Sequence, residues 1–274
     1  MFTKSLLAAL AATTLVSAHG KVAMVQGDAG GNGTALAIQG GVVPGPGRNR
    51  VTEVDTTVFK STDIMTDGLG KTTGSGKNDV AMIAQAMDLS GSTLPQVSAQ
   101  GGSLSGTFHV VTTDGAGPIE AVVDPTATGQ FSQGIKLTTT TQVPGNNGNI
   151  RPNGKVPRDT IFSRTVERVR RSLGIEKRAS NVNQDFPMAF SVPAGTTCTG
   201  TVNGVENVCL AKIANSNKAG PFGGVVPFQI VNGAPAAPAA PAAPASTSAV
   251  PAAAAAAKST KGSKNARRGV AFRA

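Results

Sequence analysis

The sequence contains few of the side chains on which most catalytic and sugar-binding sites depend. Among its 274 residues there is no Trp, no Tyr and only two His. Without Trp or Tyr, the chain has no flat aromatic platform for a sugar ring. A Ser/His/Asp triad would depend on His109 alone, and no spacing singles out a glycosidase pair among Asp114, Glu120 and Asp124.

Cysteine is equally scarce, with Cys198 and Cys209 as the only two. A secretory context favours a disulfide between them. A bridge that closes a loop of about 10 residues contributes about 2–3 kcal/mol. The alternative is a metal-binding pair, but the chain has no CxxC motif and no His close to either cysteine.

Long hydrophobic segments are also missing. Residues 1–18 have a cationic start at Lys4, an apolar run from Leu6 to Val16 and small residues up to Ala18, which is typical of a signal peptide. The run is too short to span a bilayer, and no hydrophobic segment ends the chain, so neither a transmembrane span nor a GPI anchor is expected. We therefore expect a secreted protein, cleaved after Ala18.

The positive charge is concentrated in two segments. The net charge is +10, of which residues 151–178 carry +6 and residues 233–274 another +6, so the remainder carries −2. A near-neutral body lacks the folded basic face that duplex binding needs, and we expect no nucleic-acid partner. The repeated Pro-Ala-Ala units and following basic residues of 233–274 predict a disordered tail.

Residues 151–178 contain two dibasic pairs, which end at Arg171 and Arg178. Such pairs are sites for kexin-like processing proteases of the secretory pathway. The alternative is a solvated, partly helical basic loop, in which Glu167 and Arg171 could pair. Elsewhere, Asn32-Gly33-Thr34 is an N-glycosylation sequon in a Gly-rich stretch, which predicts an exposed loop.

The body of the chain favours β structure. Residues 78–89 predict its one convincing helix, with Asn78 as a cap, whereas residues 27–47 read as loops around a short strand at 35–38. Further strands are expected at 103–113, 119–124, 134–143, 186–192, 207–213 and 225–231. The prediction is a mainly β fold: one immunoglobulin-like antiparallel β-sandwich over 19–232, interrupted by the basic loop 151–178, with one or two short helices. We expect a monomer.

His19 would become the N-terminal residue of the protein if the signal peptide were removed. Cleavage after Ala18 would leave it with a free α-amine beside its imidazole, and two nitrogen donors on one residue suit copper. The unprocessed chain could not offer that pair. Copper is therefore a candidate cofactor.

Four segments in order resemble one fungal family, that of the appressorium-specific secreted virulence proteins. They are His19-Gly20, FHVVTTDGAGPIEAVVD (108–124), FPMAFSVPAGTTCTG (186–200) and KAGPFGGVV (218–226). The resemblance implies a secreted virulence factor, in the extracellular space or cell wall at the appressorium, that contributes to host penetration. Relatives usually carry more cysteines, so at least one of their disulfides is missing here.

The family body is similar to a lytic polysaccharide monooxygenase, a β-sandwich in which two histidines grip copper. This resemblance implies His19 as the first ligand and His109 as the candidate second imidazole. Asp114 could supply an oxygen in place of His109 or beside it, and Phe222 or Phe228 could take the axial position. In a regular strand His109 and Asp114 would point to opposite faces, so a turn or bulge at Thr113 is needed to bring them together. His109 could instead be a half-buried strand residue held by hydrogen bonds.

Three functional classes follow. The first is a virulence factor that binds or handles copper. The second is a copper enzyme that cleaves host or fungal wall polysaccharide oxidatively. The third is a structural or adhesive wall protein, held to acidic polymer by its basic tail.

Overall fold

The computed structural model of the chain describes residues 19–40, 53–157, 179–218 and 220–232, and these belong to one compact unit. It is mainly β, as the sequence predicts. The elements are β1 (Gly20–Gly27), β2 (Gly30–Gly33), β3 (Thr57–Val58), β4 (Lys71–Thr72), β5 (Gly76–Lys77), α2 (Met82–Leu89), β6 (Gln96–Ser98), β7 (Gly102–Thr112), β8 (Ile119–Asp124), β9 (Ile135–Lys136), β10 (Thr138–Thr141), β11 (Asn181–Val192), β12 (Gly200–Val202), β13 (Val205–Asn215) and β14 (Phe222–Val231).

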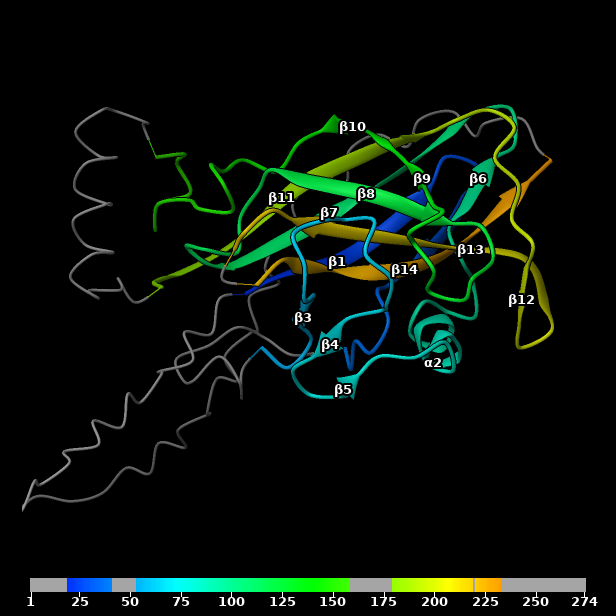
Figure 1. Ribbon diagram of the computed structural model, residues 1–274, viewed down its shortest axis with the longest axis horizontal. Helices are drawn as coiled ribbons and strands as arrows, with labels where there is room; N and C mark the ends of the chain where they lie inside the picture. Colours follow the sequence, from blue (N-terminus) through cyan, green and yellow to red (C-terminus); the bar gives the residue numbers. More distant parts are fainter. Residues whose placement is uncertain (1–18, 41–52, 158–178, 219, 233–274) are drawn as a thin grey trace, which may run out of the picture. The chain divides into compact units, whose positions relative to one another are not determined.

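The long strands form two layers that join at both edges. One layer runs β10–β11–β7–β1 and the other β14–β13–β8–β9. At one edge β1 pairs with β14 in parallel, with Lys21 opposite Gly223. At the other edge β9 and β10 are separated only by Leu137, so one continuous segment belongs to both layers. The sandwich therefore closes into a flattened barrel (Figure 1).

The pairing differs from a purely antiparallel sheet. Besides β1 with β14, β6 also pairs with β14 in parallel, while the other paired strands are antiparallel. The sheet is therefore mixed. Parallel neighbours need a crossover connection, and the long chain between β1 and β14 supplies it.

The inner core fills the barrel. Its side chains come from alternate positions of the long strands and include Val22, Phe108, Phe190, Ile213 and Phe228. Each of these is at most 1% exposed. Alternation in the sequence produces this core, because successive side chains of a strand point to opposite faces.

A second, outer core covers the other face of β8, β13 and β14. It contains Leu210 and Val225 from the strands and Ile83 from α2. In Figure 1, α2 and strands β3 to β5 lie below β13 and β14, on the side that this core occupies. Lys212 of β13 is also buried here, and its Nζ lies 4.9 Å from the ring centroid of Phe59.

Some predicted elements have different bounds. The helix begins at Met82 instead of residue 78, because the Asn78 side chain donates to the Leu69 carbonyl and accepts from Thr72 instead of capping a turn. Residues 35–38 are buried but form a turn, with Ala37 at φ 64°, so that strand prediction was wrong. The predicted strand at 134–143 is divided at Leu137, where it passes between the layers.

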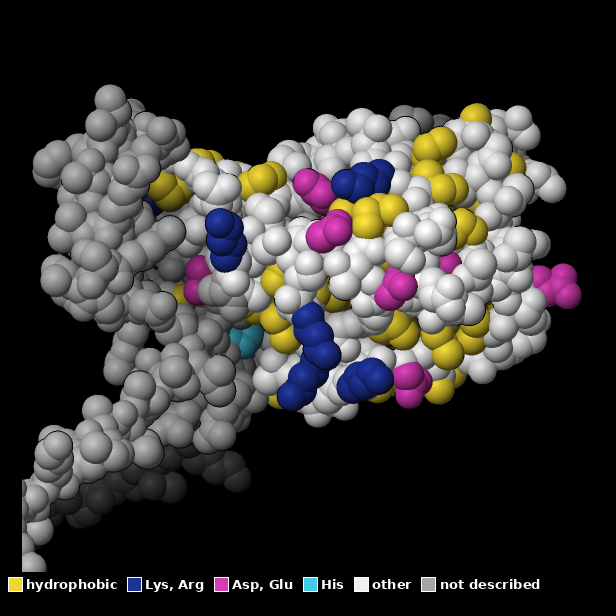
Figure 2. Space-filling model, viewed as in Figure 1, with side chains coloured by type: hydrophobic (Ala, Val, Ile, Leu, Met, Phe, Trp, Pro, Cys, Tyr) yellow, Lys and Arg dark blue, Asp and Glu magenta, His cyan; other side chains and the backbone are white. Residues whose placement is uncertain are grey.

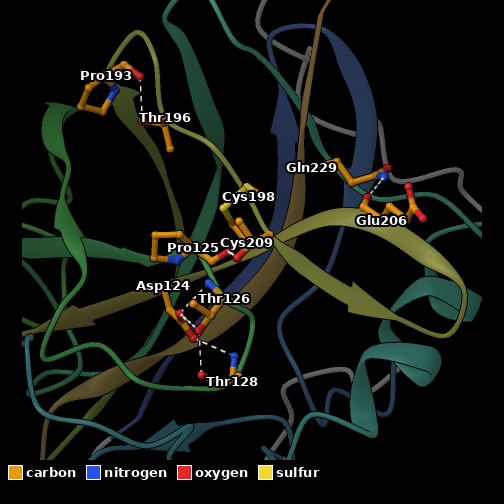
Figure 3. Close-up of a disulfide and its surroundings, with 11 residues drawn as sticks. Asp124, Pro125, Thr126, Thr128, Pro193, Thr196, Cys198, Glu206, Cys209 and Gln229 are labelled. Carbon is orange, nitrogen blue, oxygen red and sulfur yellow. Dashed lines mark hydrogen bonds between the residues drawn. A yellow bond between two sulfur atoms is a disulfide. The ribbon is translucent and has the colours of Figure 1, made fainter.

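Cys198 and Cys209 form the predicted disulfide (Figure 3). It joins the segment before β12 to β13, and Cys209 belongs to the inner core. Beside it, the buried Asp124 carboxylate accepts backbone N–H groups from Thr126, Thr128, Gly129 and Gln130. These bonds fix the turn after β8, so this carboxylate is structural.

Several sequence predictions lie outside the described residues: the signal peptide, the processing sites at Arg171 and Arg178, and the tail at 233–274. No helix in the part of the chain that the structure describes is long and apolar enough to cross a membrane. On the face shown in Figure 2, basic and acidic side chains are interspersed.

Candidate functional site

The candidate site lies at the end of the barrel where β1 begins. His19 and Gly20 pack directly against the loop between β7 and β8. A Cβ on Gly20 would lie 2.2 Å from the Gly115 carbonyl oxygen, and a Cβ on Gly115 would lie 1.9 Å from that of His19. Only glycines permit this approach, so His19-Gly20 and the Asp114–Gly117 turn are parts of one site.

His19 and Asp114 meet on one hydroxyl group. The His19 backbone nitrogen donates to Thr112 Oγ1 at 2.8 Å, and this hydroxyl donates to Asp114 Oδ1 at 2.7 Å. The His19 carbonyl also accepts from the Val111 and Thr112 N–H groups. Burial raises the pKa of the Asp114 carboxyl, although its hydrogen bond from Thr112 opposes the shift. A cation placed beside this half-buried carboxylate would be stabilised.

Two buried asparagines hold the surroundings of this site. Asn215, at the end of β13, donates to the Ala116 carbonyl at 2.8 Å and accepts from the Phe222 N–H at 2.9 Å. Asn217 donates to the Asp114 carbonyl. The loop that carries Asp114 and the strand that carries Phe222 are therefore tied to the same short segment.

Phe222 lies beside His19. Their ring centroids are 6.3 Å apart and the ring planes differ by 26°. This distance falls within the range of aromatic pairs. Of the two phenylalanines considered for the axial position, Phe228 belongs to the inner core and Phe222 is the one next to His19.

His109 has different partners. Its Nδ1 lies 2.6 Å from Asp185 Oδ1 of β11, and its neighbour across the β1–β7 ladder is Lys21, which pairs with Glu53 at 3.3 Å. Since a carboxylate only accepts, Nδ1 carries a proton, and in the neutral imidazole Nε2 is then the nitrogen with the lone pair. Nε2 is buried without a hydrogen bond to any described residue.

The structure thus brings together His19 and Asp114, while His109 lies on the neighbouring strand with Asp185. A turn does follow Thr112, and in it Asp114 accepts from the Thr112 hydroxyl, whereas the carboxylate beside His109 is that of Asp185. Within the described ranges, no set of three or more His, Cys, Asp or Glu side chains is arranged to hold a metal ion. Copper binding at His19, His109 and Asp114 stays a prediction.

Sequence reasoning missed Thr112, Asn215, Asn217 and Asp185. The one available signal was the run of polar residues Asn215-Ser216-Asn217 directly after an apolar strand, in front of the AGPFGG motif. Asn32 of the sequon is exposed, but it lies in β2 and not in a loop. Its glycosylation also stays a prediction.

Comparison with known proteins identifies relatives over most of the chain. The family model described as "Egh16-like virulence factor" matches residues 17–223. The appressoria-specific virulence factor GAS1 of Pyricularia oryzae is 37% identical over 232 residues, which cover 84% of this chain and 79% of GAS1. The appressoria-specific virulence factor GAS2 of the same fungus is 30% identical, over 83% of this chain and 88% of GAS2. The matched region contains His19, Asp114 and Phe222. The chain therefore belongs to the Egh16-like virulence factor family.

Proposed function

We propose that this protein is a secreted virulence factor that acts at the appressorium during host penetration. The names of GAS1 and GAS2 support the place of action, and the signal-like residues 1–18 support secretion.

We further propose that the end of the barrel binds one copper(II) ion. The supporting observation is that the His19 backbone nitrogen and the Asp114 carboxylate share the Thr112 hydroxyl. After cleavage at Ala18, His19 would contribute its α-amine and imidazole, and Asp114 an oxygen, a donor set that suits copper(II). A bound copper ion would supply a redox-active centre.

The protein's own residues prepare this site. Thr112 orients Asp114 toward the His19 nitrogen, Asn217 holds the Asp114 backbone, and Phe222 limits access of water to the imidazole. His109 is the further candidate ligand. Its Nδ1–H bond to Asp185 is the kind of contact that metal-binding histidines usually make with their other nitrogen.

The test is a copper(II) titration, followed by EPR, on protein that begins at His19. Matched samples carry one extra residue before His19, which removes the free amine, or the substitutions Asp114→Asn and His109→Ala. We expect submicromolar binding by the mature protein, a large loss on extension and a clear loss in Asp114→Asn. Retained affinity in His109→Ala would remove His109 from the ligand set. Weak copper binding that is equal in the mature protein and in the extended variant would refute the copper site.

A second candidate function is oxidative cleavage of a wall polysaccharide by the copper-loaded protein. The observation that favours it is Phe222 beside His19, where the resemblance to copper monooxygenases implies an aromatic residue. Copper-loaded protein with a reductant and peroxide should release oxidised oligosaccharides from chitin, cellulose or pectin. If none of these polymers yields such products, this candidate fails while copper binding stands.

A further inference from the structure

Strand β1 also borders a small cavity outside the copper site. The cavity has a volume of about 230 Å³ and is lined by residues of β1, the 34–40 segment, Asp55 and the end of α2. On β1 it meets Lys21 and Ala23, which are not part of the inner core. Lys21 is two residues from His19, so the cavity and the candidate copper site are neighbours on one strand.

The cavity wall carries one ammonium group and one carboxylate, those of Lys21 and Asp55. The Lys21 ammonium is paired with the buried Glu53 carboxylate at 3.3 Å. Asp55 is also buried, and its Oδ1 accepts the Gln39 N–H at 2.7 Å. Glu53, which does not line the cavity, already pairs with the ammonium, so no ammonium of the described residues pairs with the Asp55 carboxylate on the cavity wall. An anionic ligand would therefore be repelled, and a ligand with several hydrogen-bond donors would be favoured.

Thr34 provides a second polar contact. Its Oγ1 is buried and has no hydrogen-bond partner in the described part of the chain. Rotation about the Cα–Cβ bond would exchange this hydroxyl with the methyl group and present it to the cavity. A buried hydroxyl without a partner costs about 1–3 kcal/mol, so a ligand that pairs with it recovers that energy.

The rest of the cavity wall is apolar, and the cavity is small. Ile38 and Leu89 supply aliphatic surface, and Leu89 is 43% exposed at the mouth. The volume lies below the roughly 300 Å³ at which pockets for drug-sized ligands begin. A sugar ring matches these features, because it combines adjacent hydroxyl donors with a face of C–H groups and is small.

We infer that this cavity binds a single neutral or cationic sugar ring through Asp55 and Thr34, with Ile38 and Leu89 against its C–H face. Glucosamine, whose ammonium complements the Asp55 carboxylate, binds best, glucose binds more weakly, and glucuronate does not bind. The inference does not rest on copper.

The experiment is an NMR titration of the metal-free full chain with glucosamine, glucose and glucuronate, followed through the amide signals of Lys21, Ala23 and Gly40. We expect saturable shifts with the first two sugars only. A parallel titration with chitosan oligomers shows whether the natural ligand is the end of a polymer chain or a free monosaccharide. Oligomers that bind more tightly than glucosamine indicate a chain end, and equal affinities indicate a free monosaccharide.

Three variants give the control. Thr34→Val replaces the hydroxyl with a methyl group of similar size and should abolish the shifts without loss of stability, since that hydroxyl has no partner to lose. Because Thr34→Val also removes the glycosylation sequon, Asn32→Gln serves as its match and should bind as the wild type does. Thr201→Val, at an exposed threonine away from the cavity, should also bind normally. Absence of shifts with every sugar, equal binding of glucuronate, or normal binding by Thr34→Val would overturn the inference, whatever the copper titration shows.

Discussion

At the scale of single residues, the most unusual group is the ammonium of Lys212. It lies in the outer core, where Nζ donates to the Thr66 carbonyl at 2.6 Å and faces the rings of Phe59 and Phe131. Burial lowers the pKa of Lys212 from 10.5 to about 8, although the charges of Asp63 and Asp67 act in the opposite direction. As the pH rises, the folded protein therefore loses this proton at a lower pH than the unfolded chain does.

This difference predicts that stability rises with pH. Between pH 8 and 10.5 the unfolded chain retains the proton and the folded protein does not, so the free energy of unfolding should increase, on the order of 3 kcal/mol in total. Tyrosine and free cysteine, which also titrate at alkaline pH, do not contribute, because the chain has no Tyr and both cysteines form a disulfide. Urea unfolding at a series of pH values measures it.

Lys212→Met should remove most of this rise, because a thioether of similar length does not titrate. Lys136→Met, at an exposed lysine of β9, should keep it. A flat profile in the wild type, or an unchanged rise in Lys212→Met, would contradict the assignment.

Gly20 is the second residue whose role is local. In Gly20→Ala the new methyl group would meet both the Gly115 carbonyl oxygen and the Phe108 ring, at 2.2 and 2.8 Å. The ring belongs to the inner core and the carbonyl to a loop held by Asn215, so neither can withdraw easily. We expect a loss of at least about 2 kcal/mol in urea unfolding, against less than about 0.5 kcal/mol for Ser105→Ala on exposed β7 surface.

At the scale of elements, the end of β13 connects the candidate site to the rest of the barrel. Asn215→Ala would leave the Ala116 carbonyl and the Phe222 N–H without their partner. We expect a destabilisation on the order of 2–4 kcal/mol and amide shifts over residues 114–118. The exposed Asn181→Ala should change stability by less than about 0.5 kcal/mol. Equal stability of the two variants would show that Asn215 does not support the site.

The elements also show what sequence reasoning could reach. Strands 103–113, 119–124 and 225–231 were predicted within a few residues, because side chains alternate between the cores or a core and solvent. The prediction of a strand at 35–38 was wrong because these apolar residues are buried, as in a strand, but do not form a ladder with a neighbouring strand. Likewise, His109 and Asp185 are 76 residues apart, and only the register of β7 with β11 brings them together.

At the scale of the whole molecule, closure of the barrel makes three strands common to two cores. On β13, Ile213 and Ala211 belong to the inner core, whereas Leu210 and Ala214 belong to the outer core. β8 and β14 divide their side chains in the same way. Loss of the outer core would expose the backs of strands that hold the inner core, so neither should be stable alone.

The last prediction follows from these shared strands: both cores should unfold in one transition. The absence of Trp and Tyr removes the usual fluorescence signals, but fluorinated phenylalanine reports each core by NMR, with Phe59 and Phe131 for the outer core and Phe108, Phe190 and Phe228 for the inner. All five signals should be lost at the same urea concentration. Leu210→Ala, which removes an outer-core side chain and should cost about 2–5 kcal/mol, should move all five midpoints together. If the Phe59 and Phe131 signals disappear first, the outer core is instead a separate layer that opens while the barrel stays folded.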